Sequence, residues 1–238
     1  MNANEILNAD QDEILDEEPN AVLADGEERI SEEDAMHFLI DQIILHEWDM
    51  YQALNVEGGH DASQDDFNTF KLMRSCQFET WTPDCILHYL QDVSTAIDNG
   101  RNLMTEKYAY MMEFTAPEYY EEHLREHLNP NTMEGEQIIN SCIELLHRWN
   151  VEMDEKYPNL ARRGRPATDV GEDGTVSREI YARGELRTYS VPLLILYGKM
   201  LRAADAEGRN LAMEERDAMV RKYGFKSIDD AEAYYGEH

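Results

Sequence analysis

The sequence predicts an all-α protein, and three observations support this class. Apolar residues recur at steps of three and four along most of the chain, which is the period of an amphipathic helix. No alternation of β-branched residues is longer than four positions, and no Asn-Gly or Asp-Gly pair joins two such runs into a hairpin. Prolines and glycines separate the helical segments, as helix starts and ends require. We therefore expect about eight to nine helices, packed as one irregular helical bundle.

The first expected helix begins at Ser31 and ends near Leu54. Ser31 and Asp34 have the spacing of a capping box, and the two acidic residues between them favour the positive end of the helix dipole. The segment 55–59, which ends in two glycines, breaks the helical pattern. The apolar residues at helical spacing are Met36, Leu39, Ile40, Ile43 and Ile44.

The same periodicity predicts the remaining helices. Pro83 suits the first turn of one helix, Gly100 suits its end, and Pro158 stops the longest helix. Ser177 caps a helix that we expect to continue through the apolar run at 192–201. The expected ranges are 67–73, 83–100, 103–114, 117–128, 132–155, 177–201, 213–223 and 227–235.

One four-residue sequence occurs twice. Gly100-Arg-Asn-Leu reappears as Gly208-Arg-Asn-Leu, and each copy lies between two expected helices. A glycine that ends one helix before the next begins is common in helical proteins. Two interpretations therefore remain open, a shared type of helix junction and an internal duplication.

Acidic residues dominate the charge of the chain. The 238 residues include 50 Asp and Glu against 21 Lys and Arg, which gives a formal net charge of −29. A surface this negative repels nucleic-acid phosphates and anionic lipids, so we expect no direct DNA binding.

No apolar run approaches the roughly 18 residues of a membrane span, and the acidic N-terminus is unlike a signal peptide. With only three irregularly spaced cysteines, the sequence predicts a cytoplasmic protein with no membrane segment.

The first 30 residues differ in composition from the rest. Residues 1–34 contain 13 acidic residues and one arginine, with few apolar side chains. Such a segment buries too little apolar surface to fold alone. We expect residues 1–30 to form a mobile or loosely docked acidic arm, and residues 31–238 to form the helical domain.

Polar residues interrupt the apolar helical pattern in three clusters. Each cluster has two interpretations, part of a binding pocket or an ordinary set of helix caps and buried ion pairs. The first cluster extends from Glu47 to Gln77, the second contains Arg101, Asn102 and Lys107, and the third contains Glu185 and Tyr189.

The positive charge of the chain is concentrated at 161–187. Six arginines lie there with five acidic residues, and Arg162-Arg-Gly-Arg165 is the densest basic run. The planar guanidinium group binds phosphate and carboxylate groups through paired hydrogen bonds. This run can hold an anionic ligand or neutralise the acidic arm, and the sequence favours neither use.

Metal and thiol chemistry have weaker support. Glu144 and His147 have the Glu-x-x-His spacing of di-iron bundles, but the expected helices carry no second pair of this kind. We interpret them as an exposed pair and assign no metal ligand. Arg74 lies two residues from Cys76, a spacing that does not share a helix face, so we expect an unreactive thiol.

The polar clusters also carry a resemblance to a known family. Over residues 35–235 the chain resembles a bacterial family known as domain of unknown function 4125. The resemblance implies a helical cytosolic protein with no assigned reaction, sometimes encoded beside proteins that resemble nucleotidyltransferases. The matching segments are EWDM at 47–50, QDDF at 64–67, GRNL at 100–103, TAPEY at 115–119, KYP at 156–158, GRP at 164–166 and SREIYARGELRTYS at 177–190.

The polar positions that match this family outnumber those that packing a helical core requires. One departure is Ser63, where family members tend to carry a cysteine, so the resemblance implies no thiol mechanism at that position. The matching polar residues are Glu47, Asn55, Gln64, Arg74, Gln77, Arg101, Asn102, Lys107, Arg165, Glu185 and Tyr189.

Our first hypothesis is an enzyme or ligand-binding protein with a polar pocket between helices, for a small anionic or nucleotide-like molecule. Glu47 and Glu185 would be its buried catalytic carboxylates, candidates for general acid and base or for metal ligation. The sequence assigns neither a reaction nor a cofactor. The expected ligand-binding residues are Asn55, Gln64, Arg74, Gln77, Arg101, Asn102, Lys107, Arg165 and Tyr189.

The second hypothesis belongs to a different class of protein. It is an acidic helical interaction partner or regulator of a neighbouring nucleotidyltransferase-like enzyme. Such a protein needs an exposed apolar patch, for which the run Val191–Leu201 is the candidate.

Overall fold

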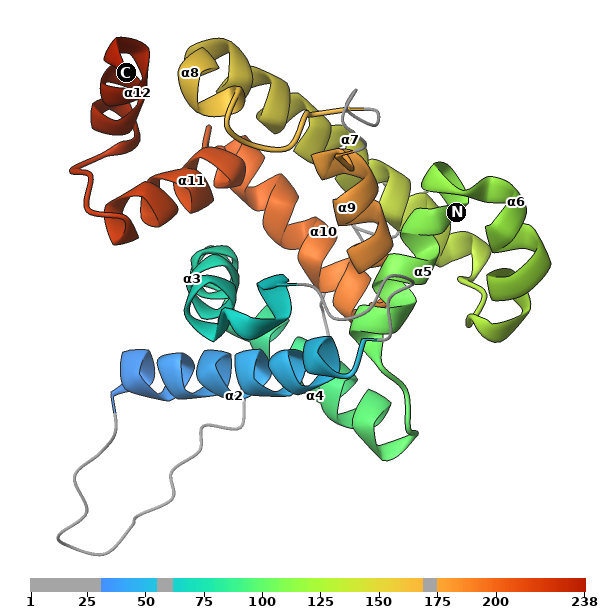
Figure 1. The fold of residues 1–238 in the computed structure, drawn as a ribbon. Coiled ribbons are helices and arrows are strands. Elements are labelled where there is room, and N and C mark those ends of the chain that lie inside the picture. Colours follow the sequence, from blue (N-terminus) through green and yellow to red (C-terminus); the bar gives the residue numbers. More distant parts are fainter. Residues whose placement is uncertain (1–30, 55–61, 169–174) are drawn as a thin grey trace, which may run out of the picture.

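Eleven α-helices and no strand make up the regular structure of residues 31–54, 62–168 and 175–238, the part of the chain that the computed structural model describes (Figure 1). The predicted all-α class is confirmed. The expected acidic arm, residues 1–30, lies outside the described residues, as does Asn55. The helices are α2 (Glu32–Gln52), α3 (Phe67–Phe78), α4 (Pro83–Asp98), α5 (Leu103–Thr115), α6 (Pro117–Tyr119), α7 (Met133–Lys156), α8 (Pro158–Ala161), α9 (Arg178–Leu186), α10 (Val191–Ala206), α11 (Leu211–Lys222) and α12 (Ile228–Glu237), with shorter turns η1 (Ala62–Asp65), η2 (Tyr120–Leu124) and η3 (Arg125–His127).

Most of the long helices begin at a polar side chain that accepts a hydrogen bond from the first turn. Ser31 accepts from the backbone N–H of Asp34 at 3.0 Å, and Thr132 accepts from that of Gly135 at 3.0 Å. These bonds satisfy donors that a helix N-terminus leaves without an intrahelical partner. The capping box expected at Ser31 therefore marks the true start of α2.

The described residues contain two helices more than the upper expectation of nine. One is the single turn α8, and the other results from a break in the helix expected over 177–201. The hydroxyl of Thr188 donates to the carbonyl of Glu185 at 2.7 Å, and the Ser190 side chain caps α10. Pro192 has no N–H to donate to the preceding turn, so α9 cannot continue into α10.

The two halves of the chain repeat one arrangement of four helices. In the first half α2 packs against α3, α4 and α5, and in the second half α7 packs against α9, α10 and α11. Helix α3 also contacts α11 of the second half, just as α9 contacts α5 of the first. Because α4 and α10 touch, the halves meet across these two helices (Figure 1).

The repeated Gly-Arg-Asn-Leu sequence forms the same junction in each half. Gly100 and Gly208 have φ angles of 67° and 72°, in the left-handed region that commonly ends a helix. Arg101 donates to both carboxylate oxygens of Glu106 at 2.8 and 2.6 Å. In the second copy, Arg209 donates to both oxygens of Glu214 at 2.9 and 2.7 Å.

The asparagine of each copy makes the same two bonds. Asn102 accepts from the first turn of α5 and donates to the carbonyl of Met50 in α2 at 2.8 Å. Asn210 accepts from the first turn of α11 and donates to the carbonyl of Trp149 in α7 at 3.0 Å. These matched long-range bonds favour an internal duplication over a chance similarity of junctions.

One hydrophobic core extends through both halves. Its members include Tyr89 of α4, Trp149 of α7 and Leu194 of α10, all almost completely buried. The run Val191–Leu201 forms the first part of α10 and contributes Leu193 and Leu194 to this core, so it does not supply the exposed patch that an interaction partner needs. Among the described helices, none is both long and apolar enough to cross a membrane.

Helix α9 comes very close to α5 at Gly184. A Cβ atom at this position would lie 2.6 Å from Cγ of Met111 and 2.8 Å from the carbonyl oxygen of Lys107. We expect Gly184→Ala to lower the free energy of unfolding by about 1–3 kcal/mol, because the backbone of α5 must move to admit the methyl group.

Gly236→Ala is the matched control for this substitution. A Cβ at Gly236 would lie 2.9 Å from Nδ2 at the end of the Asn159 side chain, whereas the Cβ at Gly184 would meet helix backbone. Urea unfolding of both variants and the parent chain measures the difference. Equal stability of Gly184→Ala and the parent chain would contradict the close contact between α5 and α9.

Candidate functional site

Two buried carboxylates and two buried cations meet between four helices. They are Glu47 of α2, Arg74 of α3, Lys107 of α5 and Glu185 of α9, and we call these four residues the central charge network. Their exposed fractions are 0%, 5%, 2% and 5%. Charged groups are buried this completely only when they are paired, so the contacts of each decide what it can do.

The Glu47 carboxylate is held mainly by Arg74. The guanidinium donates from Nε to Oε2 at 2.7 Å and from Nη2 to Oε1 at 2.5 Å, a two-pronged pair. The hydroxyl of Tyr89, on α4, also donates to Oε1 at 2.6 Å. Glu47 therefore joins α2 to α3 and α4.

The Glu185 carboxylate accepts from four side chains. Lys107 Nζ donates to Oε2 at 2.5 Å, and Arg74 Nη1 donates to Oε1 at 3.0 Å. Gln77 Nε2 and the hydroxyl of Tyr189 each donate to Oε1 at 2.9 Å. Arg74 thus bridges the two carboxylates, and Glu185 joins α9 of the second half to α3 and α5.

The network has equal numbers of positive and negative charges. Burial alone would raise the pKa of Glu185, but the charges of Arg74 and Lys107 outweigh it and hold that pKa far below its usual range. Burial would also lower the pKa of Arg74, yet the two carboxylates keep it well above its ordinary value. A carboxylate this stable in its ionised form is better suited to fixing the position of neighbouring groups than to moving protons at neutral pH.

Three other residues that the sequence selected have local structural contacts. Gln64 is buried and donates to the carbonyl of Tyr51 at 2.9 Å, which ties η1 to the end of α2. Arg101 and Asn102 form the helix junction described above. These three do not line the cavity described next.

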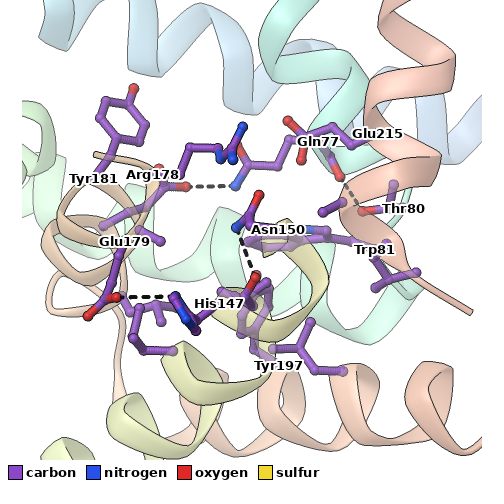
Figure 2. Close-up of a pocket in the computed structure, with 18 of the residues that line it drawn as sticks. Gln77, Thr80, Trp81, His147, Asn150, Arg178, Glu179, Tyr181, Tyr197 and Glu215 are labelled. Atoms are coloured by element: carbon purple, nitrogen blue, oxygen red, sulfur yellow. Dashed lines mark hydrogen bonds and ion pairs between the residues drawn. The ribbon is translucent and has the colours of Figure 1, made fainter. Parts of the chain in front are cut away.

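A cavity of about 180 Å³ lies beside the central charge network, among α3, α7, α9, α10 and α11 (Figure 2). Aromatic and aliphatic side chains form much of its wall, including Trp81, Tyr197 and Leu201. Glu47, Arg74 and Lys107 do not line it, and they connect to it through Glu185. Of the residues selected from the sequence, the cavity is lined by Gln77, Arg165, Glu185 and Tyr189.

Arg165 approaches the cavity with its guanidinium near an aromatic ring. Its Cζ lies 5.0 Å from the ring centroid of Tyr181, and its Nη1 donates to the carbonyl of Val176 at 3.2 Å. Lys107 Nζ lies 3.5 Å from the same ring centroid. Tyr181, which also lines the cavity, therefore contacts both a basic residue of the cavity wall and the central charge network.

The corresponding positions of the two halves follow from matched hydrogen bonds. Thr80 donates to the carbonyl of Gln77 at 2.7 Å, and Thr188 donates to the carbonyl of Glu185 at 2.7 Å. Gln77 therefore corresponds to Glu185. Counting along the helices from these residues and from the repeated junctions gives the further pairs Glu47 and Leu146, Arg74 and Ala182, Tyr89 and Tyr197, and Lys107 and Glu215.

This correspondence explains why the cavity is present. The second-half counterparts of Glu47 and Arg74 are Leu146 and Ala182, which are uncharged, and both line the cavity. Alanine fills much less space than arginine, so the four helices of the second half enclose a cavity where those of the first enclose an ion pair.

Arg178 brings two unpaired hydrogen-bond donors to the cavity wall. Its Nη2 pairs with Asp154 Oδ2, whereas its buried Nε and Nη1 have no partner among the residues that the structure describes. The Arg178 side chain is only 14% exposed. Since buried donors are almost always hydrogen-bonded, these two N–H groups are free to take an acceptor, and the buried Oδ1 of Asp154 beside them has no partner either.

Glu215 is the second polar group at the cavity with an unusual environment. Within the described part of the chain, no hydrogen bond or ion pair links its carboxyl group to another residue. Burial, offset only in part by the charge of Arg216, raises the pKa of Glu215 to about 7. Figure 2 shows Glu215 near Gln77 in the upper part of the view. His147 and Glu179, 3.6 Å apart, lie in the lower left part of the same view.

Neither Glu215 nor Arg178 is among the site residues predicted from the sequence. Arg178 counted only as one of six arginines at 161–187. The signal that could have found Glu215 is the repeated Gly-Arg-Asn-Leu sequence, since extending that alignment by four residues pairs Glu215 with Lys107. His147, half of the Glu-x-x-His pair, lines the cavity without Glu144.

Glu47→Gln tests how much the central charge network contributes to the stability of the fold. We expect it to lower the free energy of unfolding by about 3–5 kcal/mol, because it leaves the buried Arg74 with one carboxylate instead of two. Glu214→Gln, which breaks the solvent-exposed pair with Arg209, should cost no more than about 1 kcal/mol. Denaturant unfolding of both variants measures the contrast, and similar losses in the two would contradict it.

Glu215→Gln tests the raised pKa. The native chain holds this proton more tightly than the unfolded chain, whose pKa is near 4.5, so Glu215 makes stability fall as pH rises from about 4.5 to about 7. The glutamine variant lacks that slope. We expect it to be more stable than the parent chain by about 1–3 kcal/mol at pH 8, with the gain shrinking toward zero at pH 4.5. Unfolding curves at several pH values check this, and a gain independent of pH would contradict it.

Comparison with known proteins yields one match. A family model described as "Protein of unknown function (DUF4125)" matches residues 37–233. Searches of curated proteins and of solved structures give no significant match.

Proposed function

This chain belongs to the DUF4125 family, and we propose that it is a ligand-binding protein or enzyme whose cavity takes a small molecule with an anionic group. The single observation that carries the proposal is the pair of buried, unpaired donors on Arg178 at the cavity wall. A carboxylate or phosphate oxygen is the acceptor that a guanidinium binds most strongly. Arg165, from the basic run of the sequence, lines the same cavity and adds positive charge.

The size of the cavity favours a small metabolite. Sites for drug-sized ligands have volumes of about 300–1,000 Å³, and this cavity has about 180 Å³. That volume supports the small anionic molecule of the first hypothesis more than the nucleotide-like one. Aromatic walls at Trp81, Tyr181 and Tyr197 suit the apolar part of such a ligand.

The central charge network supports this role from behind the cavity wall. Glu185 lines the cavity and is held by four donors, so its orientation is fixed before a ligand enters. Glu47 acts on the cavity through Arg74 and is proposed as a positioning residue. In an enzyme, the same arrangement would present a fixed negative charge to the reacting molecule.

Arg178→Lys tests the anion site. Lysine keeps a positive charge beside Asp154 but cannot reproduce the two donors of the guanidinium. We expect pentanoate, a carboxylate with a short apolar chain, to bind the full-length protein in isothermal titration calorimetry. Its affinity should fall at least tenfold in Arg178→Lys, because a hydrogen bond to a charged group contributes about 1.5–3 kcal/mol.

Arg221→Lys is the matched control for the anion site. Arg221 lies on α11, pairs with Asp217 in solvent and does not line the cavity, so this variant should bind pentanoate as the parent chain does. Uncharged pentanol should bind much more weakly than pentanoate. Equal affinity of Arg178→Lys and the parent chain, or of pentanol and pentanoate, would contradict the proposal.

A further inference from the structure

The charged groups that line the cavity differ in whether they have partners. Glu185 is balanced by Arg74 and Lys107, and Glu179 lies 3.6 Å from His147 and 3.9 Å from Arg183. Glu215 lines the same wall without an ion pair in the described part of the chain. Two residues of the cavity wall therefore have unpaired groups, the buried donors of Arg178 and the carboxyl group of Glu215.

The cation nearest to Glu215 in sequence does not pair with it inside the cavity. Arg216 follows Glu215 on α11, and successive helix positions point in different directions. Its Nη2 atom lies 3.4 Å from the place of a Cβ on Gly164, toward the loop after α8, and Arg216 does not line the cavity. Arg165 and Arg178, which also line the cavity, bond to Val176 and Asp154 and make no ion pair with Glu215 in the described part of the chain, so a cation of the ligand can pair with it.

The first half of the chain shows the pairing that the second half lacks. Lys107, the counterpart of Glu215, donates to Glu185 at 2.5 Å, and Arg74 fills the space that corresponds to Ala182. In the second half the long basic side chain is absent and a carboxyl group stands at the lysine position. A ligand cation would restore the balance of charge that the first half achieves with its own side chains.

We infer that the ligand is a small zwitterion, an amino acid or another amine-bearing carboxylate, whose anionic group binds Arg178 and whose ammonium or guanidinium group binds Glu215. This inference rests on the proposed function for the anionic end and adds the cationic end. A molecule of this class has few heavy atoms and suits a cavity of about 180 Å³. Trp81 and Tyr197 line the same cavity, and aromatic faces attract cations.

The protonation of Glu215 makes such binding depend on pH. A ligand cation pairs with the ionised form of the Glu215 carboxyl group. Because the pKa of Glu215 is about 7 in the free protein, the ionised fraction falls between pH 8 and pH 6, and binding should weaken over this range. The groups that act on this carboxyl are Arg216 on its own helix, Glu185 on α9 and Arg74 on α3. His147 on α7 also lines the cavity, so the test must separate its contribution from that of Glu215.

The experiment compares 5-aminopentanoate with pentanoate on the full-length chain by isothermal titration calorimetry. At pH 8 we expect 5-aminopentanoate to bind at least tenfold more tightly, and this advantage to shrink about tenfold at pH 6. In Glu215→Gln the advantage and its pH dependence should disappear while pentanoate still binds. In His147→Gln both should remain.

The outcomes separate this inference from the proposed function. If pentanoate binds but the amino group gives no advantage in affinity, the zwitterion inference is wrong and the proposed anion site is retained. The same conclusion follows if the advantage persists in Glu215→Gln. If neither compound binds, the proposed function fails and the inference fails with it. Glu232→Gln, on α12 outside the cavity, is a folding control that should leave both affinities unchanged.

Discussion

The interaction on which the rest of this structure depends is the bridge that Arg74 makes between Glu47 and Glu185. Each carboxylate belongs to a different half of the chain, so one guanidinium ties α2 and α3 to α9. A buried ion pair contributes less to net stability than its short distances indicate, because both charges lose their hydration. Its main effect here is geometric, since a buried charge tolerates few arrangements other than the one that pairs it.

The corresponding helices of the second half enclose a cavity instead of a buried ion pair. Matched helix junctions show that α7, α9, α10 and α11 repeat the packing of α2 to α5. The exchange of an ion pair for leucine and alanine leaves a cavity beside the network instead of filling it. A duplicated fold can lose interior charges in one copy because the other copy still holds the two halves together.

Much of this arrangement could be predicted from the sequence. Helical periodicity located nearly all of the helices, and polar residues at apolar positions identified the buried network. The same signal also selected Gln64, Arg101 and Asn102, whose contacts belong to local junctions, because a cap and a pocket residue are alike in sequence. The members of the selected set that contact one another are Glu47, Arg74, Gln77, Lys107, Glu185 and Tyr189.

The cavity could not be predicted in this way. It depends on the small volume of Ala182 and the lack of charge at Leu146, and both look like ordinary helix residues in sequence. The break between α9 and α10 was missed for a related reason, since apolar spacing continues across it and only single residues, the cap Ser190 and Pro192, mark it. The volume of the cavity and the direction of the chain at this break depend on packing between segments far apart in sequence. The pattern of apolar residues in a single sequence does not contain that packing.

The most direct test of this account is native mass spectrometry of the full-length chain purified from cells, compared with an Ala182→Met variant. Methionine at this position extends into the cavity where Arg74 extends in the first half. The account predicts one small molecule with an anionic group bound per parent chain and none on the variant, with both chains folded. A parent chain without a bound molecule, or the same molecule on both chains, would contradict the claim that this cavity is the binding site.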